Sequence, residues 1–236
     1  MGITFIIATY NAEDSLAITL DSLVNQTDCD FEVFISDGAS TDNTVNIIES
    51  FKSQLQMKYI SQKDNGIYHA LNNGISNSSS DYINIIMAGD FHEPDFVAQV
   101  KNKLHHFDFI YGSSVCHTSN GEQRKYDPPK RLDISRITGM PFAHPSLVYR
   151  RLLHEDIGFY DESYKFASDL DFVMKLIKGG YTYSYSAHVT NYVTGGVGNS
   201  LTSLVETYKI LSRYDAPKFL VLYTLLKQFV FSFLYA

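Results

Sequence analysis

Three aspartates in the first half of the chain each follow a short run of apolar or β-branched residues. They are Asp37, Asp64 and Asp90, and the run before Asp90 covers residues 82–87. In an open α/β sheet, ligands bind just beyond the carboxyl ends of the parallel strands. Carboxylates at that edge are suited to hold a divalent cation or a polar ligand, although a single aspartate there is equally explained as an ordinary turn residue.

Four strand–helix units would bring these aspartates together. Each apolar run is followed by a polar loop and then by a helical pattern, with Gly74 expected to end the third helix and Pro94 expected in the first turn of the fourth. The strands are expected at residues 3–8, 31–35, 57–60 and 82–87. Right-handed crossovers then give an α/β fold with a parallel sheet, helices on both faces and the loops gathered at one edge.

Length and charge limit the number of domains and the partners. A chain of 236 residues is expected to form one large domain or a domain with an appendage. Its net charge of −7 and the lack of a Lys/Arg-rich stripe argue against nucleic acid. Cys29 and Cys116 have no CxxC spacing, and the first residues lack a signal-peptide pattern, so a cytoplasmic protein is expected.

Neither of the common phosphate-binding loops follows the first strand. The residues there are Ala8-Thr9-Tyr10-Asn11-Ala12, which match neither GxGxxG nor a Walker A lysine loop. This argues against a dinucleotide-binding dehydrogenase and against a nucleotidyltransferase. If a nucleotide binds at this edge, a divalent cation held by Asp90 is expected to neutralise its phosphates.

Four successive segments resemble the motifs of family 2 glycosyltransferases with the GT-A fold. They are residues 8–11, 36–42, 64–74 and 88–90. The similarity covers roughly residues 3–205 and is greatest to the bacterial branch that builds O-antigen and other surface polysaccharides. It implies a Rossmann-like mixed sheet flanked by helices, with a nucleotide-sugar-binding half at 1–113, an acceptor half at 114–205 and a C-terminal helical appendage at 206–236.

The resemblance also implies roles for single residues. Asp90 would hold Mg²⁺ or Mn²⁺ on the diphosphate of the donor, with UDP as the expected nucleotide. The residues implied to bind the donor are Thr9, Tyr10, Asn11, Asp37, Asp64, Asn72 and Gly89. Metal motifs of the family usually have two or three acids, whereas Ala88 and Phe91 flank Asp90 here, so the site is weaker or is completed by other groups.

The second half is expected to bind the acceptor. A strand at residues 107–111 and a hairpin turn at Asn120-Gly121 predict antiparallel pairing in this part of the sheet. Asp169 and Asp171 lie in the first turn of a helix that Ser168 would cap, where spacing alone explains them as partners of the helix dipole. The resemblance places the general base that deprotonates the acceptor hydroxyl at Asp169, with Asp171 as a supporting or structural acid.

Several histidines and glycines are given candidate roles as acceptor-side, loop or structural residues. His144 belongs to a segment that resembles an acceptor-side motif, and Gly195 and Gly196 belong to a glycine loop that would close over the donor or form a plain turn. His188 is expected to have a structural role rather than to bind metal. Four further histidines are interpreted as surface residues: His69, His92, His105 and His106.

The end of the chain has its own composition. Residues 219–236 are nearly all aliphatic or aromatic, and Lys209, Arg213 and Lys218 precede them. The run is shorter than the roughly 20 apolar residues of a spanning helix and fits an interfacial helix on anionic lipid, with a packing or dimerisation helix as the alternative. Membrane contact suits the acceptor that the resemblance implies, a polyprenyl-diphosphate-linked saccharide at the inner face of a bacterial plasma membrane.

The sequence thus predicts an inverting glycosyltransferase of the hexosyltransferase type. It would move a sugar from a nucleotide-sugar donor to a saccharide acceptor in surface polysaccharide synthesis, as a peripheral membrane protein on the cytoplasmic side. The reduced metal motif keeps a second interpretation open, that of a catalytically silent nucleotide-sugar-binding protein. That alternative predicts donor binding without turnover.

Overall fold

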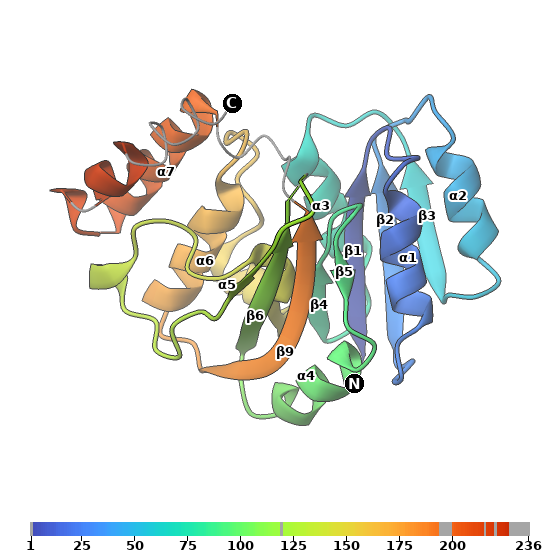
Figure 1. The fold of residues 1–236 in the computed structure, drawn as a ribbon, viewed down its shortest axis with the longest axis horizontal. Coiled ribbons are helices and arrows are strands. Elements are labelled where there is room, and N and C mark those ends of the chain that lie inside the picture. Colours follow the sequence, from blue (N-terminus) through green and yellow to red (C-terminus); the bar gives the residue numbers. More distant parts are fainter. Residues whose placement is uncertain (1, 119, 194–199, 215, 220, 227–236) are drawn as a thin grey trace.

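Apolar runs from both halves of the chain form one mixed β-sheet in the computed structural model. The structure describes residues 2–118, 120–193, 200–214, 216–219 and 221–226. Within them, nine strands join in the order β3-β2-β1-β4-β8-β6-β9-β5, and β7 pairs with β6 (Figure 1). The strands are β1 (Ile3–Thr9), β2 (Phe31–Asp37), β3 (Met57–Ser61), β4 (Tyr82–Ile85), β5 (Phe91–His92), β6 (Phe109–His117), β7 (Gln123–Tyr126), β8 (Val148–Arg150) and β9 (Tyr183–Val193).

Helices cover both faces of this sheet. The helices are α1 (Leu16–Val24), α2 (Thr44–Phe51), α3 (Ile67–Asn77), α4 (Phe96–Leu104), α5 (Leu153–Ile157), α6 (Ser168–Lys178) and α7 (Leu201–Arg213), with short 3₁₀ turns η1 (Ile134–Arg136) and η2 (His144–Ser146). None of the described helices has both the length and the apolar character needed to cross a bilayer.

The continuous apolar character of β1 follows from its burial on both faces. Ile3, Phe5 and Ile7 point into one core with α1, α2 and α4, whereas Ile6 and Ala8 point into another core with α3, α6 and α7. Side chains alternate across a strand, so a strand between two helical layers must be apolar at every position. The parallel pairing of β1 with β2 and β4, and of β2 with β3, confirms the predicted arrangement of the first half.

The sheet becomes antiparallel where the second half begins. Strand β8 lies between β4 and β6 and pairs antiparallel with both, and β5 pairs antiparallel with β9. The hairpin predicted at Asn120-Gly121 joins β6 to β7, and Gly121 has a φ of 82°, which favours glycine. The second half is therefore fused to the first through one continuous sheet.

Five details of the prediction are corrected by the structure. Ser168 is the first residue of α6 and not its cap, because the N-cap is Ala167. Helix α3 continues through Gly74 to Asn77. Gly74 allows a close approach between α3 and β1, because a Cβ there would lie 2.4 Å from Ile6 Cγ2. Helix α4 begins at Phe96, two residues after Pro94. Strand β4 ends at Ile85.

The fifth correction concerns His92, which is buried rather than exposed. Its Nε2 lies 3.0 Å from Asn84 Oδ1, and its ring stacks on Phe96 with the centroids 3.7 Å apart. His92 thus fills space between β4, β5 and α4. The domain boundary predicted at residue 205 falls inside α7, whose inner face packs into the same core as α6.

Candidate active site

The loops after β1, β2 and β3 meet at the carboxyl edge of the sheet. Asp37 accepts hydrogen bonds from Ser40 N at 3.0 Å, Ser61 Oγ at 2.6 Å and Thr9 Oγ1 at 3.2 Å. Only 1% of the Asp37 surface is exposed. The Asp37 carboxylate therefore links the ends of β1 and β3 to the loop after β2, and these hydrogen bonds engage both of its oxygens.

A first cavity of about 480 Å³ opens above these loops. Four of the residues predicted to bind the donor line it, namely Thr9, Tyr10, Asn11 and Asp64. A Cβ on Gly38 would lie 2.8 Å from Asp64 Oδ2, so the absence of a side chain at Gly38 lets the loops of β2 and β3 approach. Tyr10 is 65% exposed and offers an aromatic face to a ligand in this cavity.

A second cavity of about 710 Å³ adjoins the first. The two cavities share Ile67, Met87 and Ala88 in their walls, and the second is also lined by Asp90 and His144. A ligand long enough to extend past Ala88 would occupy both. This is the arrangement that a nucleoside diphosphate carrying a further group requires.

Asp90 is presented to the second cavity by a tight loop. Gly89 has a φ of 99° and donates its N–H to Thr19 Oγ1 at 2.9 Å, while the Thr19 hydroxyl donates to the Asp90 carbonyl at 2.7 Å. Helix α1 thus fixes the loop that follows β4. The left-handed backbone explains why glycine precedes Asp90.

The carboxylate of Asp90 is in a setting suited to a cation. Burial raises its pKa to about 7, and the backbone N–H of Val193 donates to Oδ1 at 3.2 Å. The described part of the chain holds no cluster of three or more His, Cys, Asp and Glu side chains that could bind a metal. Asp90 fits a divalent ion that takes one protein carboxylate and completes its shell with phosphate oxygens and water, which is common for Mg²⁺.

His188 is not available to such an ion. Its side chain is fully buried, and its Nε2 donates a hydrogen bond to the Ser146 carbonyl at 2.8 Å. A Cβ on Gly112 would lie 2.5 Å from the His188 ring. The structural role predicted for His188 is confirmed.

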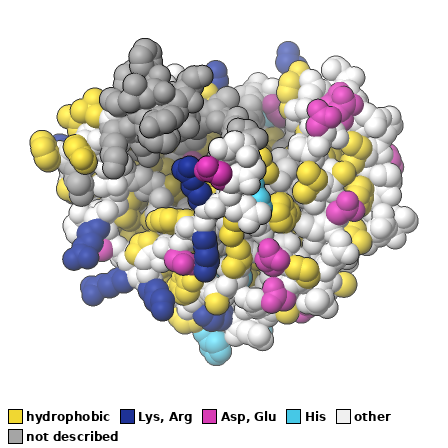
Figure 2. Space-filling view, viewed as in Figure 1, with side chains coloured by type: hydrophobic (Ala, Val, Ile, Leu, Met, Phe, Trp, Pro, Cys, Tyr) yellow, Lys and Arg dark blue, Asp and Glu magenta, His cyan; other side chains and the backbone are white. Residues whose placement is uncertain are grey.

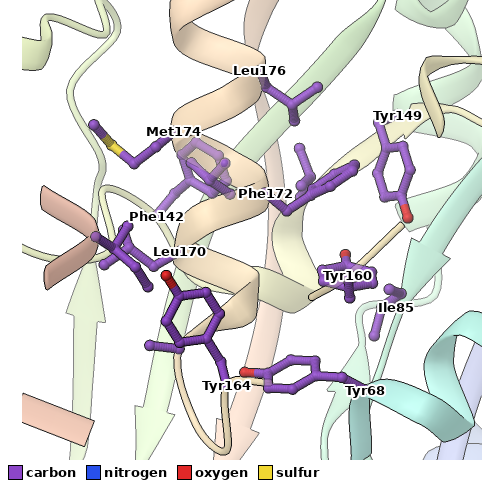
Figure 3. Close-up of a cluster of buried hydrophobic side chains, with 14 of the residues drawn as sticks. Tyr68, Ile85, Phe142, Tyr149, Tyr160, Tyr164, Leu170, Phe172, Met174 and Leu176 are labelled. Carbon is purple, nitrogen blue, oxygen red and sulfur yellow. The ribbon is translucent and has the colours of Figure 1, made fainter. Parts of the chain in front are cut away.

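Asp169 lies at the start of α6 in a connected group of polar side chains. The Tyr68 hydroxyl donates to Asp169 Oδ1 at 3.3 Å, and the Tyr68 and Tyr160 rings stack with centroids 5.8 Å apart. The Tyr160 hydroxyl in turn lies 3.0 Å from His144 Nε2. Figure 3 shows Tyr68 and Tyr160 beside the N-terminal end of α6. Because His144 lines the second cavity, this group links Asp169 to that cavity.

The charge on Asp169 also acts on its neighbours. Burial lowers the pKa of His144, and the nearby Asp169 carboxylate opposes this shift. Burial raises the pKa of the Tyr68 hydroxyl, and the Asp169 charge raises it further. Tyr68 is therefore a hydrogen-bond donor to Asp169 at neutral pH.

Like Asp37, Asn72 and Asp171 have structural partners and do not line either of the two cavities. The Asn72 amide nitrogen donates to the Tyr160 carbonyl at 2.9 Å, and the Tyr160 N–H donates to Asn72 Oδ1 at 3.0 Å. Asn72 thus holds the loop that carries Tyr160. Asp171 is buried, forms a 3.0 Å ion pair with Lys175 and accepts from the Tyr214 hydroxyl at 3.2 Å, which suits the supporting role predicted for it.

Glu206 was not predicted as a site residue, and its carboxylate accepts three backbone hydrogen bonds. From α7, its Oε1 accepts from Lys165 N at 2.9 Å, and its Oε2 accepts from Phe166 N at 2.9 Å and Ala167 N at 3.1 Å. These donors precede α6, so Glu206 fixes the start of the helix that carries Asp169. Gly195 and Gly196 lie outside the described residues.

The comparison with known proteins decides the family. A model of glycosyl transferase family 2 matches residues 4–158, which is more than half of the chain. This chain belongs to glycosyl transferase family 2. As a member of that family it is a glycosyltransferase, and the motifs at 8–11, 36–42, 64–74 and 88–90 all lie within the matched region.

Relatives of this family 2 glycosyltransferase come from several bacteria. It is 30% identical over 196 residues to a PGL/p-HBAD biosynthesis glycosyltransferase of Mycobacterium bovis (strain BCG / Pasteur 1173P2), covering 80% of this chain and 73% of the relative. It is 36% identical over 89 residues to the chondroitin synthase of Pasteurella multocida, covering 36% of this chain and 9% of that enzyme.

Solved structures share the fold of this glycosyltransferase. The crystal structure of S. aureus TarS 1-349 matches with a TM-score of 0.72 at 21% identity, over 98% of this chain and 71% of that one. The same protein in complex with UDP-GlcNAc matches with a TM-score of 0.73 at 19% identity, over 97% and 72%. The expected GT-A fold, a mixed sheet flanked by helices, is confirmed.

Proposed function

We propose that this enzyme transfers a sugar from a UDP-sugar to a saccharide acceptor with inversion at the anomeric carbon. The observation that carries the proposal is the continuity between the two cavities. Thr9, Tyr10 and Asp64 stand in the first cavity, and Asp90 stands in the second, where the diphosphate would lie. The TarS structures with UDP and UDP-GlcNAc support a uridine nucleotide in a fold of this kind.

The acceptor hydroxyl would react at the far end of the second cavity. Its oxygen forms a bond to the anomeric carbon, the bond from that carbon to the diphosphate oxygen breaks, and the hydroxyl proton passes to the Asp169 carboxylate. A positioned carboxylate acting as general base contributes about 10²- to 10⁴-fold to such a step. Tyr68 holds this carboxylate in place through its 3.3 Å hydrogen bond.

Asp90 is the residue proposed to hold Mg²⁺ or Mn²⁺. A divalent ion bound there would compensate the charge of the nucleoside diphosphate. The net charge of −10 on residues 1–113 supports this assignment, because this half of the chain has more carboxylates than cationic side chains to offer a diphosphate.

The acceptor and the location are proposed from the family resemblance and the surface. We infer a polyprenyl-diphosphate-linked saccharide, met at the inner face of a bacterial plasma membrane during O-antigen or other surface polysaccharide synthesis. Exposed apolar side chains on α7 and the residues after it support contact with lipid, among them Val205, Phe219 and Leu222.

The test is donor turnover by the full chain without an acceptor. UDP-, GDP- and dTDP-sugars are incubated with Mn²⁺, Mg²⁺ or EDTA, and nucleoside diphosphate release is measured. We expect slow, metal-dependent release from a UDP-sugar. Asp90→Asn should lower the rate about 100-fold or more, since it removes the charge that holds the cation.

The matched control is Asp81→Asn. Asp81 is exposed and lies just before β4, at the opposite end of the strand from Asp90, so its replacement should leave the rate within about twofold. Metal-dependent binding of donors without release from any of them, with lipid-linked acceptors also present, would instead indicate the catalytically silent binding protein.

A further inference from the structure

Charge is divided unequally between the two halves of this enzyme. Residues 1–113 carry 5 Lys, no Arg and 15 Asp and Glu, which is a net charge of −10. Residues 114–236 carry 14 Lys and Arg against 11 Asp and Glu, which is a net charge of +3. Figure 2 shows Lys and Arg gathered mainly on the side of the second half and Asp and Glu mainly on the side of β1 to β3. Without a bound cation, an anionic ligand is therefore favoured at the second half.

The cations of the second half are concentrated beside the active site. Five of the 14 lie between Arg124 and Arg136, in the segment that runs from β7 to η1. Two of the five, Arg131 and Arg136, line a third cavity of about 360 Å³. Both arginines are exposed to solvent, and they share the wall of this cavity.

The third cavity adjoins the second one. Tyr126 and Met140 stand in the walls of both, whereas the second cavity meets the first at different residues. The Tyr126 hydroxyl donates to the Pro141 carbonyl at 3.2 Å, which fixes the ring between the two spaces. The three cavities thus form a series, and the third lies where the part of an acceptor beyond its reacting sugar would extend.

The two arginines retain capacity for a ligand. Arg136 is 87% exposed on its side chain, and its Nε lies 3.8 Å from Asp133 Oδ2, a distance too long for a strong hydrogen bond. Asp133 is itself engaged, because its Oδ1 accepts from the Ser135 N–H at 3.0 Å and hydroxyl at 2.7 Å. Arg131 has no carboxylate within 4.0 Å in the described part of the chain, but it lies near Asp133, which also lines this cavity. The Ser135 hydrogen bonds lower the pKa of that carboxyl, and Arg136 and Arg131 lower it further.

We propose that Arg131 and Arg136 bind a phosphate group carried by the acceptor. The proposal rests on the proposed function, because it assumes that the acceptor reacts in the second cavity. A guanidinium group offers paired N–H donors that match two phosphate oxygens, and it stays charged at any physiological pH. The phosphate could belong to the diphosphate that joins a saccharide to its lipid or to a phosphate within the saccharide, and both present the same oxygens.

The test measures binding to the full chain by calorimetry, with UDP and Mn²⁺ in excess so that the donor site is filled. The probes are geranyl diphosphate for the lipid-side source, glucose 6-phosphate for the saccharide source and glucose as the neutral reference. We expect one phosphate probe to bind at least about tenfold more tightly than glucose. The tighter of the two identifies the source.

The decisive variant is Arg131→Gln with Arg136→Gln. It should weaken the preferred probe about tenfold or more, which corresponds to a loss of about 1.4 kcal/mol. The matched control, Arg124→Gln with Lys125→Gln, removes the same charge from the adjacent strand β7, where Arg124 pairs with Glu122 and Lys125 with Asp127. The control should change binding less than about twofold.

Two results would overturn the proposal. One is that neither phosphate probe binds better than glucose. The other is that the Arg131→Gln, Arg136→Gln variant loses no more affinity for the phosphate probe than the control does. The net charge of the protein alone would then account for the binding. Donor turnover without acceptor is measured on the unaltered enzyme and on the Arg124→Gln, Lys125→Gln control, and it should be equal in the two. If the unaltered enzyme shows no donor turnover, the proposed function is rejected. If it turns over the donor but binds neither phosphate probe better than glucose, only this inference is rejected.

Discussion

The two oxygens of Asp169 are in different settings. Oδ1 accepts from the Tyr68 hydroxyl at 3.3 Å and from the Leu170 N–H at 2.8 Å. Within the described residues both hydrogen bonds go to Oδ1, which leaves Oδ2 for an acceptor hydroxyl. The bound oxygen fixes the orientation of the carboxylate, and the other one can take the proton. This division of roles is what a general base on a rigid helix requires.

Replacing Asp169 by Asn should therefore remove turnover without removing the donor site. We expect the rate of nucleoside diphosphate release to fall about 100-fold or more, because the amide cannot accept a proton, while the donor affinity stays within about threefold. Donor hydrolysis and donor calorimetry on the same preparation measure the two quantities. Asp171→Asn is the control on the same helix, and it should lower the melting temperature through loss of its partner Lys175 yet retain turnover. Equal turnover in Asp169→Asn would show that another group takes the proton.

Residues at the sheet edge could be predicted, whereas their partners could not. Asp64 and Asp90 follow apolar runs, and the geometry of parallel strands is sufficient to bring them to one edge. Asn72 and His92 have no such signal, since Asn72 bonds to Tyr160, 88 positions away, and His92 bonds to Thr190, 98 positions away. Contacts of that separation depend on tertiary packing and leave no local pattern.

At the scale of elements, α7 serves as a support for α6. Glu206 accepts three backbone N–H groups that precede α6, while Ile210 and Leu211 of the same helix are fully buried. A buried backbone donor left without a partner costs about 1–3 kcal/mol, so one carboxylate stabilises the whole turn. Helix α7 therefore fixes the start of the helix that carries the proposed general base.

Glu206→Gln should reduce turnover through the position of Asp169. The amide keeps the size of the side chain but offers one accepting oxygen in place of two, so at least one N–H group loses its partner. We expect the turnover rate to fall about tenfold, with donor affinity nearly unchanged, because the first cavity is distant in the fold from α7. A Glu206→Asp variant, which restores both oxygens on a shorter stem, should recover part of the rate. If Gln lowers only the melting temperature and the Asp variant gives no recovery of rate, Glu206 stabilises the fold without positioning the base.

The extent of single elements shows where local patterns fail. The sequence predicts α3 correctly but ends it at Gly74, since a glycine after a helical pattern usually marks its end. The structure uses Gly74 for close contact with Ile6 of β1. The two uses of glycine look identical in sequence, and only the neighbouring strand distinguishes them.

At the scale of the molecule, one surface combines apolar and basic side chains. Residues of α7 and of the helical positions 218–219 and 221–226 expose seven large apolar side chains, each more than a third exposed. They are Leu201, Val205, Tyr208, Phe219, Leu222, Tyr223 and Leu226. Lys209 and Lys218 are exposed in the same part of the chain. A surface of this composition suits the interface of an anionic bilayer, and it also suits a second protein copy.

Vesicle sedimentation of the full chain separates these two roles. We expect binding to vesicles that contain phosphatidylglycerol, and weaker binding to phosphatidylcholine alone, because each nearby Lys or Arg adds about 1 kcal/mol on an anionic surface. Phe219→Ser with Leu222→Ser should lower vesicle binding about tenfold or more, since each side chain would otherwise bury apolar area in the interface. The matched control is Leu152→Ser with Phe159→Ser, which alters the same two residue types at exposed positions elsewhere on the surface, 56% and 45% exposed. If the tail variant keeps its vesicle binding but changes from dimer to monomer in light scattering, the surface joins two copies of the enzyme and membrane contact must come from another part of the chain.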